Sequence, residues 1–568
     1  MPAMIAPTPS DLSLPLHVVA CASAPTFDAF ERVRARADEL GRKALGAGRR
    51  VVLSVADPEG FRTGGVPGVT VEDDNGCTGL SVRFWTVPVA RFARELGADA
   101  DLLILEDGGA LGVLRPILTR ETRVCVLSGE VPPGFEPDIS PGIFEAFDVV
   151  APGLLRTTRT RPAATRATQC GDVLVIGAGL AGAFIAVALA DRGWRPIVVD
   201  AGRAPASEAS ALYAGLFHPH WQASDSPVFQ LTRAGCRAMA ALRSRVPEAF
   251  VDCGVLDVAS DAAEWEHWCE AVRRGVPFPM PEREARLVGR DEAAQLCGLA
   301  VSRGGWWFPG SGIVHPSLLS RRLLELTGAS LLVHTPVHLR RDCMSGLWEA
   351  VTAEGAVVAR AGHAVVAAAG GSPEVFGMRR EDYGLTRLYG RISLLRDTDL
   401  STLKTALTGA GYVVRLGDGF TAAGATYEPD GPNLSAPEAH AHNLEVFERL
   451  LDEQPELLVG GFYEGERAVP LDRMPIVGRL LARGELEKRV FRGRPAPEEL
   501  PVEPGLWGLF GLGSRGLSWG WLCAEVLADA MTGLPPRIPA SLSAALHPAR
   551  FAARRCGDGR LTSCRSTA

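Results

Sequence analysis

Hydrophobic positions in the first 150 residues follow two alternating patterns. Short runs rich in Val, Ile and Leu, such as "RRVVLSVAD" and "ADLLILEDGG", are typical of buried strands. The stretch "TFDAFERVRARADELGRKALGAG" has helical spacing and ends in glycine. Strands that alternate with helices are typical of a mostly parallel sheet covered by helices. We therefore predict a separate α/β domain over residues 1–150, and the pattern assigns it no role.

A different pattern begins at Gly171 with "GDVLVIGAGLAGAFIAVALADRGWRPIVVDAG". It predicts a buried strand, a glycine-rich turn, a helix and a second strand. Gly177 permits the tight turn, Gly179 lets the backbone approach a pyrophosphate, and Gly182 lets the helix pack closely on the strand. Asp200 ends the second strand, where an acid binds a ribose hydroxyl and repels a 2′-phosphate. This βαβ Rossmann unit is predicted to bind a dinucleotide, either FAD or NAD.

Two further glycine-rich turns favour FAD. Strand-like runs after residue 330 lead to a turn that contains Gly370, and a strand near the C-terminus leads to "GLGSRGLSWGW". This second turn contains Gly513, Arg515 and Gly516 and opens a helix. A glycine-rich turn at a helix N-terminus presents N–H groups to an electronegative ligand. Three such elements along one chain suit a long cofactor that is held at both ends.

The segments between and after these parts differ in composition. Residues 151–170, "APGLLRTTRTRPAATRATQC", are predicted to be a linker, either a solvated connector or a basic strap beside a polyanion. Residues 556–568 have the composition of a frayed tail. The first 150 residues contain 14 Lys and Arg and 21 Asp and Glu, so they carry the whole net charge of −7. A nucleic-acid-binding domain is expected to have the opposite bias.

Composition also bears on membranes, metals and redox compartment. No run of 18 apolar residues is present, so no membrane span is predicted. The 12 cysteines form neither a C-x-x-C pair nor a Cys/His cluster, so neither a metal site nor a disulfide framework is predicted. "FHPHW" places His218 and His220 two residues apart, which fits a loop or pocket wall better than a metal site. We expect a reduced, cytoplasmic protein.

Ordered motifs over residues 171–552 carry a resemblance to a known family. They are "ASEASALYAGLFHP", "GGWWFPGSGIVHPSLLSRRLL", "GFTAAGATYEPD", "ERAVPLDRMPIVG" and "GLGSRGLSWGWLCAEVLA". Together they resemble the D-amino-acid-oxidase/glycine-oxidase (DAO) superfamily of flavoproteins. Within it, they are most similar to the FAD-dependent oxidase half of bifunctional enzymes that modify the tRNA wobble uridine.

The sequence departs from that pattern twice. Tyr389, Gly390 and Arg391 stand where the family has Arg-Gly-Gln, which puts details of the pocket in doubt. The partner half in those bifunctional enzymes is a methyltransferase with a Phe-Gly-x-Gly motif, and residues 1–150 contain no such motif. The methyl-transfer activity therefore does not carry over to this chain.

The resemblance implies a two-part flavoprotein over residues 171–555 that binds FAD noncovalently. One part is a Rossmann FAD-binding domain, and the other is a substrate domain with a mixed or antiparallel sheet. FAD binding is expected at about 171–215, 330–375 and 460–552, and substrate binding at about 216–329 and 376–459. The expected cofactor-binding residues are Gly177, Gly179, Gly182, Asp200, Ser210, Val337, Gly370, Gly513, Arg515 and Gly516.

The resemblance also implies oxidation of a C–N bond. Such a site needs a clamp for the substrate carboxylate, and Arg467 in "GERAVPLDRMP" takes that place in the family motif; otherwise it is a structural arginine. Tyr412 and Tyr427 either donate hydrogen bonds to substrate or pack in the core. Trp306 and Trp307 either line an aromatic cleft or pack in the core.

The remaining expectations concern two arginines, Arg515 and Arg473, and the reaction that the protein catalyses. Arg515 is expected to place positive charge near the flavin, and Arg473 is expected to pair structurally with its neighbour Asp472. The first functional hypothesis is oxidation of the carboxymethylaminomethyl group of tRNA wobble uridine, with release of glyoxylate. The alternative is a small-molecule amine or amino-acid oxidase with no nucleic-acid substrate. A non-catalytic FAD-bound scaffold is disfavoured by the intact fingerprint.

Overall fold

The computed structural model divides the chain into two compact units. One contains residues 1–170 and 528–543, and the other contains residues 171–527 and 544–568. The second unit is described from residue 170 to 557, apart from 277–279, 398–399, 418, 430, 490 and 492. Before residue 170 the structure describes 16–21, 29–37, 51–57, 68–73, 80–86, 89–96, 100, 102–105, 114, 117, 123–126, 135–137 and 154–157.

The first unit is built on one sheet of order β3-β4-β2-β1-β5-β6-β8-β7 among its described residues. Strands β4, β2, β1, β5 and β6 are parallel, whereas β3 and β8 run antiparallel to their neighbours. The α/β prediction for this part is therefore confirmed. The bounds are β1 Leu16–Cys21, β2 Val51–Ala56, β3 Gly68–Asp73, β4 Leu80–Thr86, α2 Val89–Leu96, β5 Leu102–Leu105, β6 Arg123–Val126, β7 Phe135–Pro137 and β8 Leu154–Thr157.

The strand order reverses on the two sides of β1, as in doubly wound folds. The likeness is one of fold alone, because topology does not imply function and the glycine-rich motif is missing from the sequence.

The boundaries of this unit differ from the sequence prediction at both ends. Strand β8 lies inside the predicted linker 151–170, where it pairs with both β6 and β7. Residues 528–543, which the sequence placed within the FAD-binding part at 460–552, belong to this unit. A helix that leaves one unit and ends in another gives no local signal of the change.

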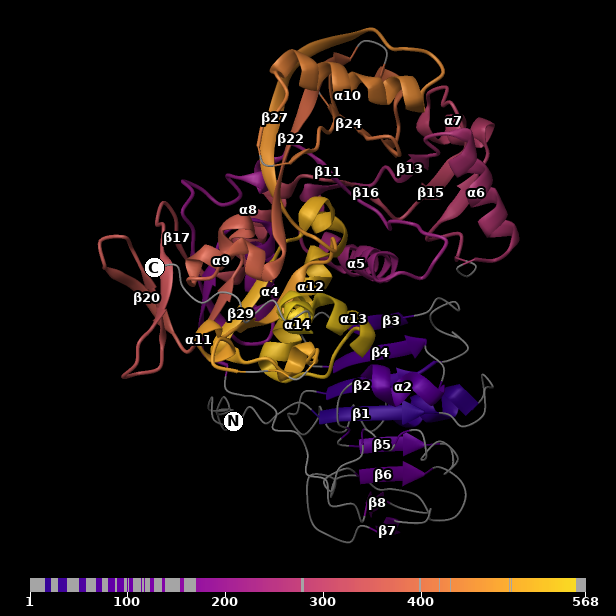
Figure 1. Cartoon of the computed structure of the whole chain (residues 1–568). Coiled ribbons are helices and arrows are strands. Elements are labelled where there is room, and N and C mark those ends of the chain that lie inside the picture. The colour runs from indigo at the N-terminus through magenta and orange to yellow at the C-terminus, as the bar shows by residue number, and fades with distance from the viewer. Residues whose placement is uncertain are drawn as a thin grey trace, which may run out of the picture. The chain divides into compact units, whose positions relative to one another are not determined.

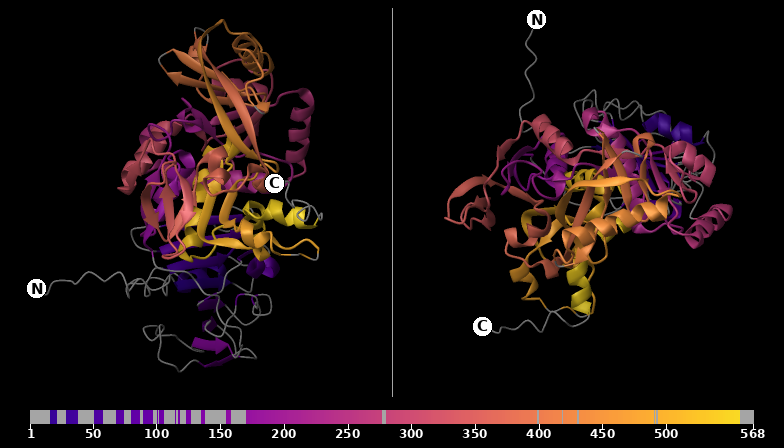
Figure 2. Two further views of the ribbon diagram at one scale, coloured as in Figure 1. Left: turned by 60° about the vertical axis from the view of Figure 1, so that its left-hand side comes forward. Right: turned by 90° about the horizontal axis from the view of Figure 1, so that it is seen from above.

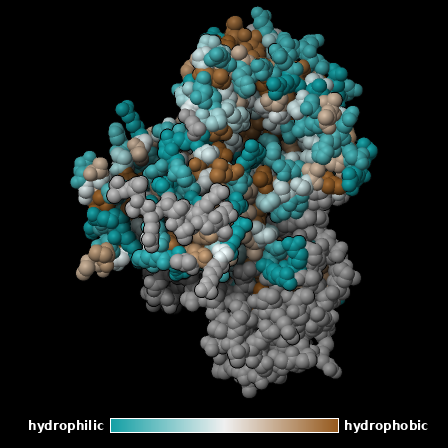
Figure 3. All heavy atoms as spheres, in the orientation of Figure 1, coloured by the Kyte–Doolittle hydropathy of each residue, from teal (hydrophilic) through white to brown (hydrophobic). Residues whose placement is uncertain are grey.

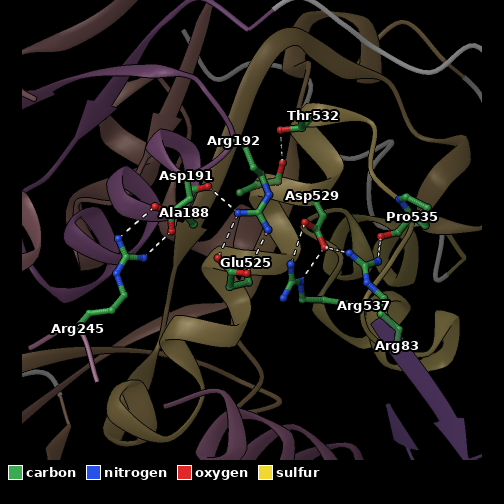
Figure 4. A network of polar contacts seen from close by, with 11 residues as sticks. Arg83, Ala188, Asp191, Arg192, Arg245, Glu525, Asp529, Thr532, Pro535 and Arg537 are labelled. Carbon is green, nitrogen blue, oxygen red and sulfur yellow. Dashed lines mark hydrogen bonds and ion pairs between the residues drawn. The ribbon is translucent and has the colours of Figure 1, made fainter. Parts of the chain in front are cut away.

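A buried ion cluster joins residues 528–543 to the sheet of the first unit (Figure 4). Asp529 accepts a hydrogen bond from Arg83 on β4 at 3.0 Å, and Arg83 also donates to the carbonyl oxygen of Pro535. Arg537 donates twice to the same carboxylate, at 2.7 and 3.1 Å. All three charged side chains are almost fully buried. One carboxylate therefore compensates two buried arginines.

We expect Asp529→Ala to destabilise the first unit by about 3–5 kcal/mol, because removing one partner leaves buried charge uncompensated. Hydrogen exchange of peptides that cover β4 measures the loss of protection. Asp172→Ala is the control, since Asp172 pairs with Arg195 in an exposed ion pair worth at most about 1 kcal/mol. Unchanged exchange in β4 of the Asp529 variant would contradict the assignment.

The second unit contains a parallel sheet of order β17-β10-β9-β21-β29-β28, in which only β28 is antiparallel to its neighbour. Helix α4 is apolar on all sides, and eight of its eleven residues are buried. The predicted Rossmann fold is confirmed. The bounds are β9 Asp172–Ile176, α4 Leu180–Ala190, β10 Arg195–Val199, β17 Ser330–Leu332, β21 His363–Val366, β28 Ile476–Leu481 and β29 Val502–Phe510.

A second, mixed sheet of the same unit has the order β14-β15-β13-β23-β24-β25-β22-β26, and β27 pairs with the other edge of β22. The β22–β27 ribbon is long and runs from near α12 to beneath α10 (Figures 1 and 2). The prediction had placed β27 largely in the FAD-binding part. The bounds are β13 Val255–Val258, β14 Arg286–Val288, β15 Gly305–Phe308, β22 Leu385–Asp397, β23 Ala406–Thr408, β24 Tyr412–Gly417, β25 Phe420–Gly424, β26 Glu428–Pro429 and β27 Leu457–Pro470.

Helices and two small sheets complete the second unit, although the parts of α12 and α13 within residues 528–543 belong to the first unit. No helix among the described residues is long and apolar enough to cross a membrane. The remaining bounds are β11 Gly215–Phe217, α5 Pro227–Arg243, β12 Phe250–Val251, α6 Ala262–Arg273, α7 Arg290–Cys297, β16 Gly312–Val314, α8 Pro316–Thr327, β18 His338–Arg341, β19 Trp348–Val351, β20 Val357–Ala361, α9 Ser372–Val375, α10 Ala436–Leu450, α11 Arg483–Leu486, α12 Gly516–Thr532, α13 Ala540–Leu546 and α14 Arg550–Gly557.

Candidate active site

The first glycine-rich turn fits closely between β9, β21 and α4. Gly177 has a φ of +113°, and a Cβ atom there would lie 2.5 Å from the carbonyl oxygen of Ala367. A Cβ atom on Gly182 would overlap the carbonyl oxygen of Gly177. Both glycines are therefore required by the packing of the turn, as the fingerprint predicts.

Polar groups stand where a dinucleotide would meet this turn. The Asp200 carboxylate, directly after β10, accepts hydrogen bonds from the backbone N–H groups of Ala178 at 2.5 Å and Gly202 at 2.7 Å. Ser210 Oγ accepts from the backbone N–H of Leu180 at 3.1 Å. Gly179 is the N-cap of α4, and it supplies no side-chain cap to the first N–H groups of the helix. This arrangement fits a ribose hydroxyl at Asp200 and a pyrophosphate at the N-terminus of α4.

The other two glycine-rich turns lie at the same edge of the sheet. Gly370 lies in a 3-10 turn at Ala369–Gly371 that follows β21. Gly513, with a φ of +58°, begins the 3-10 turn Gly513–Arg515 after β29, and α12 starts at Gly516. Because β9, β21 and β29 are adjacent and parallel, all three turns meet at their carboxyl ends. The structure thus brings together turns that are about 140 residues apart or more in sequence.

Val337 has a less direct place in this site. It lies just before β18 and is half-buried against the core cluster that contains Ile176 and Val199 at the ends of β9 and β10. Its place is compatible with backbone contact to the adenosine end of the cofactor, which stays a prediction.

Arg467 lies on β27 beside the third turn. Its Nη1 donates to Ser514 Oγ at 3.0 Å, and its guanidinium carbon is 5.1 Å from the ring centre of Tyr427. Gly390 lies next to it on β22, and a Cβ atom there would overlap the Arg467 guanidinium. The glycine of the divergent Tyr389-Gly390-Arg391 segment therefore makes room for the arginine. Arg467 has no carboxylate partner among the described contacts, so its charge is available to a ligand.

The divergent Arg391 has a structural role. Its Nη1 donates to the carbonyl oxygen of Leu434 at 2.6 Å, and its Nε donates to Glu464 at 3.2 Å. Arg391 therefore connects β22 to β27 and to the loop before α10. None of these contacts involves Arg467.

Tyrosines surround Arg467. Tyr412 is largely buried, and its hydroxyl has no hydrogen-bond partner in the described part of the chain. Burial raises its pKa, and the positive charge of Arg467 acts in the opposite direction. A buried hydroxyl without a partner can donate a hydrogen bond to a substrate. Tyr427 is 58% exposed, so the core reading of this residue is wrong.

Two further tyrosines of this cluster were not predicted. The Tyr463 hydroxyl donates to the carbonyl oxygen of Glu208 at 3.0 Å, and burial raises the pKa of Tyr463 to about 12. Tyr213 packs edge-on against Tyr463, with ring centres 6.1 Å apart. Tyr463 precedes Arg467 by four residues on one strand, and this even spacing could have indicated a shared face. Tyr213 gives no local signal.

Arg515 carries positive charge in the third turn, near two histidines. Arg515 is half-buried, and its guanidinium lies 5.9 Å from the Trp519 ring. Burial, with a smaller contribution from the charge of Arg515, lowers the pKa of both His218 and His220 to about 4. Both histidines are therefore neutral at neutral pH, and Arg515 carries the charge. This fits the predicted electrostatic role of Arg515 beside a flavin, which stays a prediction.

The structure also bears on the expectations for Asp472 and Trp306. Asp472 forms a two-pronged ion pair with Arg550, at 2.8 and 2.9 Å, so the expected pair with the exposed Arg473 is wrong. Trp306 is buried and stacks on Trp221 at 4.8 Å, which supports the core reading. Within the described residues, no group of three or more His, Cys, Asp or Glu could hold a metal ion.

Comparison with known proteins identifies the family. The family model described as "DAO: FAD dependent oxidoreductase" matches residues 172–530. The chain belongs to the DAO family of FAD-dependent oxidoreductases. FAD is its cofactor, and the glycine turns described above fit that group.

The relatives add detail. The chain is 35% identical over 421 residues to the "tRNA 5-methylaminomethyl-2-thiouridine biosynthesis bifunctional protein MnmC" of Burkholderia pseudomallei (strain 668), covering 72% of this chain and 63% of that protein. The chain thus matches less than two thirds of this relative. Burkholderia mallei (strain SAVP1) has a protein of the same name with the same identity and coverage.

Solved structures agree on the fold. Glycine oxidase from Bacillus cereus is 21% identical, with a TM-score of 0.51 over 64% of this chain and 95% of that chain. Iminodiacetate oxidase from Chelativorans sp. BNC1 is 23% identical, with a TM-score of 0.51 over 64% of this chain and 96% of that chain. At these identities the likeness shows the fold of the DAO unit.

The first turn gives a test of FAD binding by this DAO-family chain. We expect Gly177→Ala to lower FAD occupancy at least about tenfold, because a Cβ atom would strain the positive φ and press on the Ala367 carbonyl. The measurement is the ratio of flavin to protein absorbance after gel filtration. Gly362→Ala is the matched control, since its Cβ would enter open space. Full occupancy in the Gly177 variant would contradict the role of this turn.

Proposed function

We propose that the DAO unit oxidises the C–N bond of an N-substituted glycine. The observation that carries the proposal is the position of Arg467, which has no carboxylate partner among the described contacts and donates to Ser514 in the third glycine turn. A planar fork binds a carboxylate through two parallel hydrogen bonds. Bound FAD supplies the hydride acceptor for such a reaction.

The protein's own groups orient the substrate. Arg467 holds the carboxylate, and the Tyr412 hydroxyl is placed to donate a second hydrogen bond. The methylene carbon between carboxylate and nitrogen loses hydride, and a C=N bond forms. Water then adds to that carbon, the C–N bond breaks, and glyoxylate and an amine are released.

We further propose that the N-substituted glycine is the carboxymethylaminomethyl group of tRNA wobble uridine. Support comes from the 35% identity to proteins named for tRNA 5-methylaminomethyl-2-thiouridine biosynthesis. That group ends in a carboxymethylamine, so it presents the carboxylate that Arg467 requires. A tRNA substrate places the reaction in the cytoplasm.

A small carboxylated amine is the second candidate. The structural likeness to glycine oxidase and iminodiacetate oxidase concerns the fold, yet both are named for substrates with a carboxylate next to an amine carbon. The acidic first 150 residues also favour a substrate other than RNA.

Anaerobic flavin bleaching separates the two candidates. The holoenzyme is mixed with tRNA that carries carboxymethylaminomethyluridine, with the same tRNA carrying unmodified uridine, and with iminodiacetate or glycine. The tRNA proposal expects rapid bleaching and one glyoxylate per flavin with the modified tRNA only. Bleaching by the small amines, with none by modified tRNA, would refute the tRNA substrate and leave C–N oxidation standing.

We expect Arg467→Lys to lower kcat/KM on the order of 10- to 150-fold while FAD stays bound. Lysine keeps the charge but loses the planar fork, and a charge-assisted hydrogen bond is worth roughly 1.5–3 kcal/mol. Single-turnover flavin reduction measures the effect. Arg396→Lys, at an exposed site on β22, is the control. An equal loss with an analogue that lacks the carboxylate would contradict the clamp.

A further inference from the structure

The rim of the Arg467 site carries two solvent-exposed aromatic rings. Tyr213 is 50% exposed and Tyr427 is 58% exposed. Of the six tyrosines in the chain, four belong to the cluster around Arg467. Exposed aromatic side chains that gather around one site mark a binding surface, whereas single scattered ones do not.

Contacts on the inner side hold both rings in place. Tyr213 lies edge-on to Tyr463, which the hydrogen bond to the Glu208 carbonyl fixes. His315 Nδ1 lies 3.0 Å from the carbonyl oxygen of Tyr213 and steadies its backbone. Tyr427 packs against the Arg467 guanidinium. The buried edges of these rings are thus engaged within the site, and about half of each side chain is left toward solvent.

Two acid–arginine pairs lie beside the rim. Glu464 pairs with Arg391 at 3.2 Å, and Glu466 pairs with Arg387 at 3.0 Å. The face in Figure 3 is mainly hydrophilic, with hydrophobic residues in small separate patches. Because these four charges are paired with one another, the exposed rings of Tyr213 and Tyr427 are the surface that the rim offers to a flat base.

We infer that Tyr213 and Tyr427 are stacking platforms for unpaired nucleobases of the substrate. The inference rests on the proposed oxidation of a carboxymethylamino group and adds how the attached RNA is recognised. A substrate whose carboxylate reaches Arg467 brings its own base, or a neighbouring base, to the rim. Proteins recognise single-stranded RNA loops by stacking splayed bases on such aromatic side chains. A free amino acid has no group that would use these rings.

The test compares Tyr213→Ala and Tyr427→Ala with wild type in the full-length holoenzyme. The probes are an anticodon stem-loop RNA with carboxymethylaminomethyluridine at the wobble position, and iminodiacetate. We expect each alanine variant to weaken binding of the RNA on the order of 5- to 150-fold, as loss of one stacked base does. The FAD content stays unchanged in both variants, and flavin reduction by saturating iminodiacetate stays unchanged in Tyr213→Ala. In Tyr427→Ala, which also loses the contact with Arg467, RNA binding falls by more than iminodiacetate turnover does. Tyr213→Phe and Tyr427→Phe keep the ring, so both retain wild-type binding.

Met344→Ala is the control, because Met344 is 91% exposed and lies in the turn between β18 and β19. RNA binding that is unchanged in both tyrosine variants would overturn the inference while leaving the tRNA oxidation intact. A loss of FAD would instead make the rings cofactor contacts and would also overturn it. The tRNA proposal itself would be refuted if the wild-type enzyme were reduced by iminodiacetate but neither bound the RNA nor were reduced by it.

Discussion

The arrangement of this site depends on three parallel strands, β9, β21 and β29, that lie side by side and end in glycine-rich turns. Parallel pairing sets all three turns at one edge, and two of the turns open helices α4 and α12. Just after the C-terminal end of α4, Arg192 forms a buried two-pronged ion pair with Glu525 on α12, at 3.1 and 3.2 Å (Figure 4). The helices whose N-termini face the cofactor are thus fixed to each other as well as to the sheet.

The substrate side adds a second constraint, the β22–β27 ribbon. It pairs Leu388 with Arg467 and leaves a glycine beside the guanidinium. Because β27 contacts both the turn after β21 and the turn after β29, the same ribbon that belongs to the substrate sheet brings Arg467 to the cofactor edge. The tyrosines follow from this placement, since Tyr463 shares β27 and Tyr412 begins β24.

The sequence predicted what depends on local pattern. The βαβ unit, the glycine turns and the family motifs are short-range signals, and the structure assembles them as expected. Long-range packing decides the features that the sequence did not predict. Asp472 pairs with Arg550 instead of Arg473, and Tyr213 lies beside Tyr463. Residues 528–543 belong to the first unit instead of the FAD-binding part. Tyr427 was misjudged because the sequence placed it on a strand, whereas it lies in the short link between β25 and β26. Strand β8 was missed because it has only four residues, LLRT, within a segment whose composition resembles a linker.

The central claim is that Arg467 receives a carboxylate at the edge where the three turns hold FAD. A crystal structure of the holoenzyme soaked with glycolate, a carboxylate that lacks the reacting amine, tests it most directly. The account predicts the carboxylate paired with both terminal nitrogens of Arg467, within hydrogen-bond reach of the Tyr412 hydroxyl and against the flavin ring between Gly370 and Gly513. Glycolate bound at Arg515 or Arg473, with Arg467 still held only by Ser514, would contradict it.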